Sequence, residues 1–327
     1  MKLFAYALRP YDELPVLKKI AAEAGFSFNW TSDYPNEDNA ALAQGADALS
    51  IITNPMPASL LDTYHALGIR AIATRSIGYD HIDVEHAHAL GMRIAHAAYP
   101  PEGVADYTIM LMLMALRRAK LIFNQNAVQN FDLEGKIGRT LSSCTVGIIG
   151  TGAIGTQVAQ ELSGFGCKIL AYDPYPSDKL SETVSYTSLD ALLSASDLVT
   201  LHAPGLPENY HLISAREFNL MKSGAILINA ARGMLVDTNA LIDAIESGKL
   251  SAAALDTVEH ESNLYYQNKS LSVLPNRDRA LLMAYPNVIV SPHMAFYTEE
   301  DVEGMVRSTT YALQAFLNNQ TSAYEVL

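Results

Sequence analysis

Three closely spaced glycines give this 327-residue chain its clearest chemical signal. They lie in residues 146–155 (VGIIGTGAIG), between an apolar stretch typical of a strand and a segment typical of a helix. In such a turn the first glycine permits the bend, the second lets the backbone approach a pyrophosphate, and the third lets the helix pack closely. The free N–H groups at the helix start would attract the phosphates. The residues predicted to lie against a dinucleotide here are Gly150, Gly152, Ala153, Ile154 and Gly155.

An acidic residue ends the next predicted strand. Residues 168–172 are mainly apolar, and Asp173 follows them. Its carboxylate would accept hydrogen bonds from the adenine ribose hydroxyls, and its charge would repel a 2′-phosphate. The sequence therefore predicts NAD(H) rather than NADP(H) as the cofactor. The plainer alternative is an ordinary strand–turn–helix unit in which Asp173 caps a helix or lies on the surface.

Polar residues also follow four later strands of this pattern. Ligands of open α/β sheets collect beyond the carboxyl ends of the strands, so these residues are candidates for chemistry. His202 and Pro204 follow one strand, Arg232 the next, Glu261 a third and His293 the last. The arginine, the glutamate and the histidine would face the nicotinamide end of a cofactor.

These three residue types together suit hydride transfer to a 2-keto acid. Arg232 offers a planar fork of donors that would bind the substrate carboxylate and polarise the ketone. Negative charge builds on the ketone oxygen as hydride arrives, and His293 would supply the proton because histidine titrates in the useful range. Glu261 beside His293 would favour the imidazolium and fix its orientation. The hydride itself would come from a nicotinamide cofactor.

Several of these residues have plainer explanations. Arg232 alone could equally form a salt bridge at a strand end, and His293 alone would more simply be a core histidine. Glu259 precedes Glu261 by two residues, and spacing alone does not choose between them. Four other histidines cluster in the sequence, but their spacing matches no metal-ligand pattern, so no metal site is expected. They are His81, His86, His88 and His96.

The elements that must position these residues follow an alternating pattern. In the first hundred residues, strands are predicted at 3–7, 48–53, 71–74 and 93–97, and helices at 15–24, 58–67 and 84–90. After a long connecting helix predicted over 102–130, strands are predicted at 145–149, 168–172, 197–202, 225–229, 252–256 and 288–291. The later helices are predicted at 156–162, 189–193, 215–221, 238–247 and 299–317. Repeated strand–helix–strand units imply parallel sheets with right-handed crossovers.

Composition narrows the class of partner. The net charge is −13, hydrophobic residues make up 49%, and no block of lysine and arginine interrupts the acidic balance. These values fit a globular α/β protein and argue against nucleic acid or an anionic membrane as the main partner. The most apolar run, residues 109–116, is far too short for a membrane span. The chain starts like a strand rather than a signal peptide, and its two cysteines form no disulfide framework, so a cytoplasmic location is expected.

Several separated stretches resemble the D-isomer-specific 2-hydroxyacid dehydrogenase family, over essentially the full length of the chain. The resemblance is greatest to the D-lactate dehydrogenase branch, which includes the vancomycin-resistance type. The stretches are 74–83 (TRSIGYDHID), 103–108 (GVADYT), 146–155, 229–233 (NAARG), 254–261 (ALDTVEHE) and 286–298 (PNVIVSPHMAFYT).

The resemblance implies a role for each candidate residue. The catalytic trio of the family falls on Arg232, Glu261 and His293, which favours Glu261 over Glu259. The residues implied for the substrate are Ile77 and Gly78, through backbone N–H groups that hold the carboxylate, and Tyr99 and Phe296, which line the pocket. The residues implied for the cofactor, besides the glycine turn and Asp173, are Ala231 and Asp256 at the nicotinamide carboxamide, with His202 and Pro204 beside them.

The family fold implied for the chain has two Rossmann-like α/β domains. A doubly wound parallel-sheet NAD domain, residues 101–296, is inserted in a smaller flavodoxin-like substrate domain made of residues 1–100 and 297–327. The site is expected in the cleft between the domains. A homodimer formed through the NAD domain and the long helix is also implied.

The chain departs from the family pattern at a few positions. Residues 99–102 (YPPE) stand where the lactate branch often has YSPN or YSPD, and the extra proline removes a backbone donor. Met294 replaces a more usual threonine or isoleucine. Asp173 differs from the uncharged residue of the resistance type, which suits NADPH, and this favours an NADH-using, catabolic enzyme.

The predicted function is NADH-dependent reduction of pyruvate to D-lactate. A D-2-hydroxyisocaproate or phenyllactate dehydrogenase, with the same chemistry and a wider pocket, is the alternative within the family. An NAD-sensing regulator without catalysis is the alternative from another class, and the complete trio argues against it.

Overall fold

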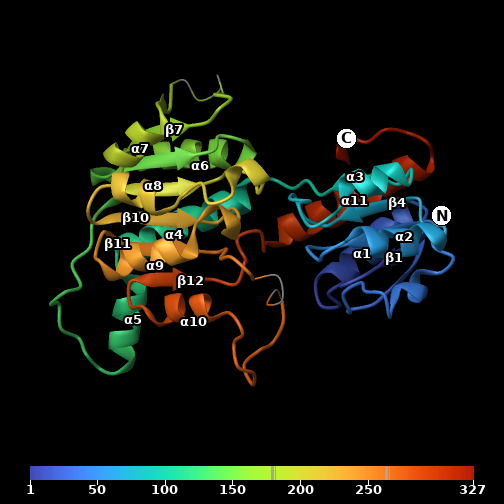
Figure 1. Ribbon diagram of the computed structural model, residues 1–327, viewed down its shortest axis with the longest axis horizontal. Helices are drawn as coiled ribbons and strands as arrows, with labels where there is room; N and C mark the ends of the chain where they lie inside the picture. Colours follow the sequence, from blue (N-terminus) through green and yellow to red (C-terminus); the bar gives the residue numbers. More distant parts are fainter. Residues whose placement is uncertain (178–179, 181, 262–263, 265) are drawn as a thin grey trace. The chain divides into compact units, whose positions relative to one another are not determined.

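The computed structural model describes residues 1–177, 180, 182–261, 264 and 266–327. The chain divides into two compact units, one made of Met1–Pro100 with Tyr297–Leu327 and the other of Pro101–Phe296. Each unit is built on its own mainly parallel sheet with helices packed on it (Figure 1). The prediction of an α/β fold with two Rossmann-like sheets is therefore confirmed.

The first unit has a flavodoxin-like sheet. Its strand order in the described residues is β13-β5-β4-β3-β1-β2, parallel except for β13, which runs antiparallel to β5. The strands are β1 (Lys2–Ala5), β2 (Ser27–Trp30), β3 (Ala48–Ile51), β4 (Ala71–Thr74), β5 (Arg93–His96) and β13 (Glu325–Val326). The helices are α1 (Glu13–Glu23), the 3-10 helix η1 (Ala40–Ala43), α2 (Ala58–Ala66), α3 (Val84–Ala89) and α11 (Glu299–Leu317).

Burial explains why these segments form strands and helices. Every residue of β3 and β4 is buried, as expected for inner strands of a sheet covered on both faces. In α11 the buried apolar residues recur at helical spacing, for example Val302, Met305, Val306 and Leu313. Thr298 caps this helix by accepting a hydrogen bond from the backbone N–H of Asp301.

The second unit has a doubly wound sheet. The strand order is β12-β11-β10-β9-β6-β7-β8, and the described pairings are all parallel. The strands are β6 (Thr145–Ile149), β7 (Lys168–Tyr172), β8 (Ser185–Tyr186), β9 (Leu198–Leu201), β10 (Ala225–Asn229), β11 (Leu250–Leu255) and β12 (Val288–Val290). The strand order reverses between β6 and β9, and ligands of such sheets bind at that switch point.

The helices of the second unit lie between these strands in the chain. They are α4 (Glu102–Leu116), α5 (Ala119–Ala127), α6 (Ala153–Ser163), α7 (Leu189–Ala195), α8 (Ala215–Leu220), α9 (Thr238–Glu246) and α10 (Arg277–Ala284). Short 3-10 helices are η2 (Leu141–Ser143), η4 (Pro207–Asn209) and η5 (Gly233–Leu235). Within the described ranges, no helix is both long and apolar enough to cross a membrane.

The prediction of one helix over 102–130 is wrong. The chain bends after α4, because Arg118 adopts a left-handed backbone conformation with φ of 51°, and α5 begins at the next residue. The composition changes at the same point, from the apolar α4 to a polar α5. The short strands β2, β8 and β13 and the charged helix α10 were not predicted, because none of them carries a strong periodic pattern.

A buried ion pair joins the strand ends of the first unit. Arg75, directly after β4, donates from Nε to Glu13 Oε1 at 2.8 Å and from Nη1 to Ser50 Oγ at 2.8 Å. Its Nη2 donates to the carbonyls of Tyr6 and Ala7, both at 3.0 Å. Glu13, at the start of α1, is fully buried. These bonds tie α1 to the ends of β1, β3 and β4.

We expect Glu13→Ala to lower the free energy of unfolding of the chain by about 3–5 kcal/mol, because it leaves the Arg75 guanidinium buried without its carboxylate. Urea denaturation followed by circular dichroism measures the change. The matched control is Arg70→Ala, which breaks the exposed 3.4 Å pair with Asp47 and should cost less than about 1 kcal/mol. Equal losses in the two variants would contradict a stabilising role for the buried pair.

Candidate active site

The glycine turn after β6 is tightly packed at two positions and open at the third. Gly150 has φ of +92°, and its N–H donates to the carbonyl of Tyr172 at 2.9 Å. A Cβ added at Gly155 would lie 2.0 Å from the carbonyl oxygen of Gly150, so only glycine lets α6 approach the turn. A Cβ added at Gly152 would meet no atom within 4 Å.

This turn fits the pyrophosphate of a dinucleotide. Gly152 and Ala153 are exposed, whereas Ile154 is half-buried and packs against the sheet core. Among the described residues, no side chain accepts a hydrogen bond at the Gly152 cap of α6, where the first N–H groups of a helix have no partner within the helix. An uncapped helix start beside a glycine opening suits an anionic phosphate group.

Asp173 is tied to the glycine turn. Its Oδ2 accepts hydrogen bonds from the backbone N–H of Thr151 at 2.6 Å and from the Thr151 hydroxyl at 3.1 Å. Its Oδ1 accepts from the N–H of Tyr175 at 2.8 Å. A carboxylate has further lone pairs, so the group retains acceptor capacity for ribose hydroxyls. This position at the end of β7 suits the predicted selection of NAD(H).

His202 follows β9 and borders the same turn. A Cβ added at Gly150 would lie 2.7 Å from the carbonyl of His202, which shows how closely the two segments meet. The ring Nε2 lies 3.0 Å from the Thr200 hydroxyl, and burial lowers the pKa of His202 to about 4. His202 is therefore uncharged at neutral pH. Pro204, two residues further on, is exposed.

Asn229 shapes the loop that carries Arg232. This buried side chain, at the end of β10, accepts from the N–H of Ala231 at 3.0 Å and donates to the carbonyl of Arg232 at 2.9 Å. Arg232 Nη1 donates to the carbonyl of Ala231 at 2.9 Å. A Cβ added at Gly233 would lie 2.3 Å from the carbonyl carbon of Val258. Glycine is thus needed where this loop meets the segment that leads to Glu261.

Glu261 and His293 form a largely buried pair. His293 Nδ1 lies 3.2 Å from Glu261 Oε1, and the two side chains are 16% and 8% exposed. The other oxygen, Glu261 Oε2, accepts from the backbone N–H of Val258 at 3.0 Å and lies 3.4 Å from Arg279 Nη1. The carboxylate therefore holds the histidine ring through Nδ1.

Asp256 holds the loop that carries His293. Its fully buried carboxylate accepts from the N–H groups of Met294 (2.9 Å) and Ala295 (2.8 Å) and from the Ser291 hydroxyl (2.6 Å). Its carbonyl accepts from the N–H of His293 at 2.9 Å. His293 has φ of 54°, a left-handed conformation that costs energy in a residue with a Cβ. The predicted approach of Asp256 to a nicotinamide carboxamide stays a prediction.

Glu259 and Glu261, which the spacing in the sequence does not distinguish, have different partners in the structure. Glu259 Oε1 lies 2.9 Å from His211 Nε2, and its Oε2 accepts from the N–H and the hydroxyl of Thr238 at 3.0 and 2.7 Å. Glu259 thus supports the start of α9, and Glu261 is the carboxylate beside His293.

The residues expected to bind substrate lie in both units and are described within each. In the first unit, the Ser76 hydroxyl donates to the carbonyl of Gly78 at 2.7 Å and fixes the loop that contains Ile77. Tyr99 packs against α11, where a Cβ added at Gly304 would lie 2.8 Å from the Tyr99 Cβ. In the second unit, the ring of Phe296 meets Tyr266 edge-on, with centroids 6.0 Å apart.

The histidines of the first unit are dispersed. His81 Nε2 lies 3.0 Å from the Thr74 hydroxyl, and His86 Nε2 lies 2.8 Å from Asp62 Oδ1. In the part of the chain that the structure describes, no group of three or more histidine, cysteine or acidic residues is placed to hold a metal ion.

Comparison with known proteins decides the family. Residues 109–295 match the family described as D-isomer specific 2-hydroxyacid dehydrogenase, NAD binding domain. The chain belongs to this family. The dehydrogenase is 44% identical to a D-specific alpha-keto acid dehydrogenase of Enterococcus faecalis, covering 91% of this chain and 90% of that one. It is 38% identical to an aromatic 2-oxoacid reductase of Clostridium sporogenes, covering 97% and 96%.

Solved structures agree with this assignment. A D-2-hydroxyisocaproate dehydrogenase matches with a TM-score of 0.88 and 35% identity, over 100% of this chain and 99% of that one. A D-lactate dehydrogenase from Treponema pallidum matches with a TM-score of 0.88 and 30% identity, over 100% of both chains. The family prediction and NAD as the cofactor of this dehydrogenase are confirmed. The roles of individual site residues stay predictions.

Two residues that shape the candidate site were missed in the sequence. Asn229 was visible as the last residue of a predicted strand, but only the structure shows that its side chain shapes the Arg232 loop. Nothing in the sequence pointed to Arg279 as a site residue, because its segment was not predicted as a helix and lies 18 residues from Glu261 in the chain.

We expect Gly152→Ala to fold normally but to weaken NADH binding at least about tenfold, or about 1.4 kcal/mol, because the new methyl group occupies space needed by the pyrophosphate. Titration of NADH fluorescence and thermal unfolding measure the two effects. Gly155→Ala is the contrasting variant, because its Cβ would strike the Gly150 carbonyl and should cost about 1–3 kcal/mol of stability. Normal NADH affinity in Gly152→Ala would contradict the assignment of this turn.

Proposed function

We propose that this dehydrogenase reduces pyruvate to D-lactate with NADH. The Glu261–His293 pair carries the proposal, because it places an oriented histidine just beyond the end of β12, on the strand edge that also carries the Arg232 loop. Parallel strands bring their carboxyl ends to one edge of a sheet, so β6, β10, β11 and β12 supply the glycine turn and the three residues together.

Arg232 is assigned to the substrate. Its guanidinium would bind the carboxylate of a 2-keto acid and polarise the adjacent ketone, which a planar set of donors does better than a point charge. In the first unit, we assign the backbone N–H groups of Ile77 and Gly78 to the same carboxylate. Tyr99 and Phe296 are assigned to the pocket wall. These four assignments rest on the resemblance to the family.

His293 is assigned as the proton donor. Glu261 is bonded on the Nδ1 side of the ring, so the proton would leave from Nε2 toward the ketone oxygen as negative charge develops there. Glu261 stabilises the imidazolium and fixes the ring, while Asp256 fixes the backbone of the same loop. When bound, NADH supplies the hydride. Asp173 and the glycine turn would hold its adenosine and pyrophosphate, and Ala231, His202 and Pro204 would lie nearer the nicotinamide.

A bulkier 2-keto acid is the second candidate substrate. The support comes from relatives named aromatic 2-oxoacid reductase and D-2-hydroxyisocaproate dehydrogenase, both similar over nearly all of this chain. The chemistry at His293 would be unchanged, and only the pocket wall would differ.

We expect His293→Ala to lower kcat/KM for pyruvate by about 100- to 10,000-fold while NADH binding is retained, because only the proton donor is removed. NADH oxidation is measured with pyruvate, 2-ketoisocaproate and phenylpyruvate, and the chirality of the product is determined. The matched control is His260→Ala, since His260 is exposed and lies beside Glu261 in the chain. A preference for a bulkier acid would favour the second candidate. Wild-type NADH binding without turnover of any acid would favour a regulator.

We also propose that the dehydrogenase forms a homodimer through an arm, defined as residues 119–137. The structure describes every residue of α5, and none of them is buried. Phe131 is 74% exposed and Leu133 is 84% exposed, and Phe123 and Ile137 are exposed as well. Large apolar side chains gathered on one segment are typical of a surface that a partner covers. A second copy of the chain is the partner that we assign.

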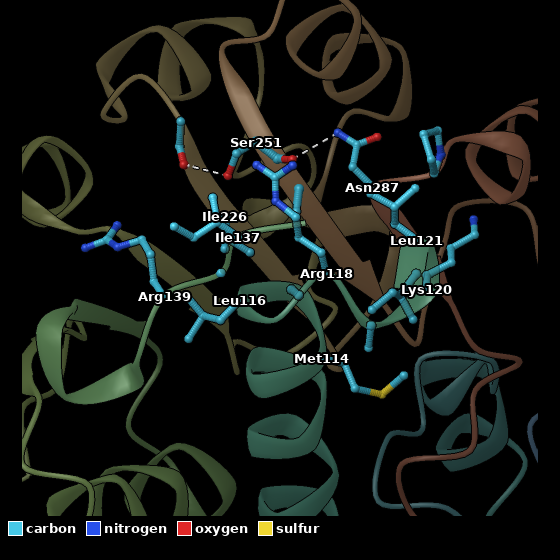
Figure 2. Close-up of a pocket in the computed structure, with 17 residues that line it drawn as sticks. Met114, Leu116, Arg118, Lys120, Leu121, Ile137, Arg139, Ile226, Ser251 and Asn287 are labelled. Atoms are coloured by element: carbon cyan, nitrogen blue, oxygen red, sulfur yellow. Dashed lines mark hydrogen bonds between the residues drawn. The ribbon is translucent and has the colours of Figure 1, made fainter. Parts of the chain in front are cut away.

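A pocket at the base of the arm offers a place for such side chains (Figure 2). Its volume is about 200 Å³, and its wall includes Met114, Leu116, Leu121 and Ile226. The pocket lies at the amino ends of β10 and β11, on the edge of the sheet opposite to the candidate site. Lys120 secures the base of the arm, because its Nζ donates to three backbone carbonyls near the start of β12.

We expect the double variant Phe131→Ser, Leu133→Ser to be a folded monomer, because it removes two of the most exposed apolar side chains of the arm. Size-exclusion chromatography with light scattering gives the mass at micromolar concentration. Leu271→Ser, which changes a fully exposed leucine outside the arm, is the control and should remain dimeric. A monomeric wild type, or a double variant that is still dimeric, would contradict the proposal.

A further inference from the structure

A buried arginine extends the Glu261–His293 pair. Arg279 lies in the first turn of α10 and is only 6% exposed. Its Nη1 lies 3.4 Å from Glu261 Oε2, and its Nη2 donates to the carbonyl of Ser291 at 3.1 Å. One guanidinium therefore contacts both the carboxylate and the segment that leads into His293.

We propose that Arg279 is a positioning residue that keeps Glu261 charged and oriented throughout the reaction. This inference rests on the proposed role of His293 as proton donor. The two carboxylate oxygens of Glu261 have different partners. Oε1 faces His293, and Oε2 faces Arg279 and the N–H of Val258. The carboxylate thus has a permanent countercharge that does not depend on the protonation of the histidine.

The need for this countercharge follows from the proton transfer. Before transfer, the imidazolium of His293 balances the charge of Glu261. After His293 has given its proton to the substrate, the buried carboxylate of Glu261 faces a neutral ring, and an uncompensated charge at such a site is costly. Arg279 remains charged at every accessible pH, so it supplies the missing balance. Glu261 can then stay ionised and continue to accept the Nδ1–H of the ring.

Asn276 holds the start of α10, the helix that carries Arg279, in place. Asn276 caps α10 by accepting from the N–H of Arg279 at 2.9 Å, and its Nδ2 donates to the carbonyl of Glu259 at 2.8 Å. The same side chain therefore starts the helix and joins it to the segment that ends at Glu261. The helix start, the carboxylate and the Ser291 carbonyl together define the position of the guanidinium.

Three variants test the proposal. Arg279→Met keeps the length of the side chain but removes the charge, and it should lower kcat about 10- to 100-fold while the Kd for NADH is unchanged. Arg279→Lys keeps the charge and should recover most of that loss. Arg277→Met, on the same helix but exposed, is the matched control and should behave as wild type. A wild-type kcat in Arg279→Met would overturn the proposal.

A double-mutant cycle separates positioning from general packing. In a Glu261→Gln background, adding Arg279→Met should have little further effect on kcat, because no carboxylate remains to be balanced. A fully additive loss would mean that Arg279 acts independently of Glu261 and would overturn the proposal.

A spectroscopic readout keeps the inference distinct from the proposed function. In protein labelled with ¹⁵N-histidine, the His293 signals, assigned by their loss in His293→Ala, should show the Nδ1–H tautomer in the wild type. Arg279→Met should change that pattern, even if no 2-keto acid is turned over by the wild type. Identical spectra would overturn the role of Arg279, whereas absent turnover with changed spectra would count only against the proposed reaction.

Discussion

One buried carboxylate organises the chemistry of the second unit. Asp256 is fully buried and accepts three hydrogen bonds from the loop after β12, two of them from consecutive backbone N–H groups. These bonds hold the loop in which His293 adopts a left-handed backbone conformation, which costs energy in a residue with a Cβ. The backbone of this loop positions the His293 side chain, and the contact with Glu261 determines that Nδ1 is the ring nitrogen that faces the carboxylate. Pre-organisation of this kind is what removes orientational cost from a reaction.

The parallel sheet supplies the rest of the arrangement. Asn229, Asp256 and Ser291 each stand at the carboxyl end of a strand or directly after it, and each bonds to the loop that carries a candidate residue. Glycines occur where loops from neighbouring strands must touch, as at Gly150 against His202 and Gly233 against Val258. The site is thus built from short loops held by buried polar side chains, on a sheet whose strands fix their spacing.

Local patterns in the sequence were sufficient for part of this structure. The glycine turn, Asp173 and the last helix, predicted over 299–317, depend on neighbours in the chain, and the helix is observed at the predicted bounds. The break at Arg118 was missed because no glycine or proline marks it and a helix lies on each side of it. The choice of Glu261 over Glu259, and the contact of Arg279 with Glu261, depend on hydrogen bonds between distant segments. Such contacts leave no periodic trace in the sequence.

The two edges of the second sheet carry different surfaces, and this division has an evolutionary consequence. The Arg232 loop follows the carboxyl end of β10, whereas the pocket and the arm lie at its amino end. A strand of this length separates the two by roughly 15 Å. Substitutions in the arm can therefore accumulate without moving the Arg232 loop. The arm, through which we propose assembly, and the loop that carries Arg232 can thus diverge independently among descendants of this chain, because the strand keeps them apart.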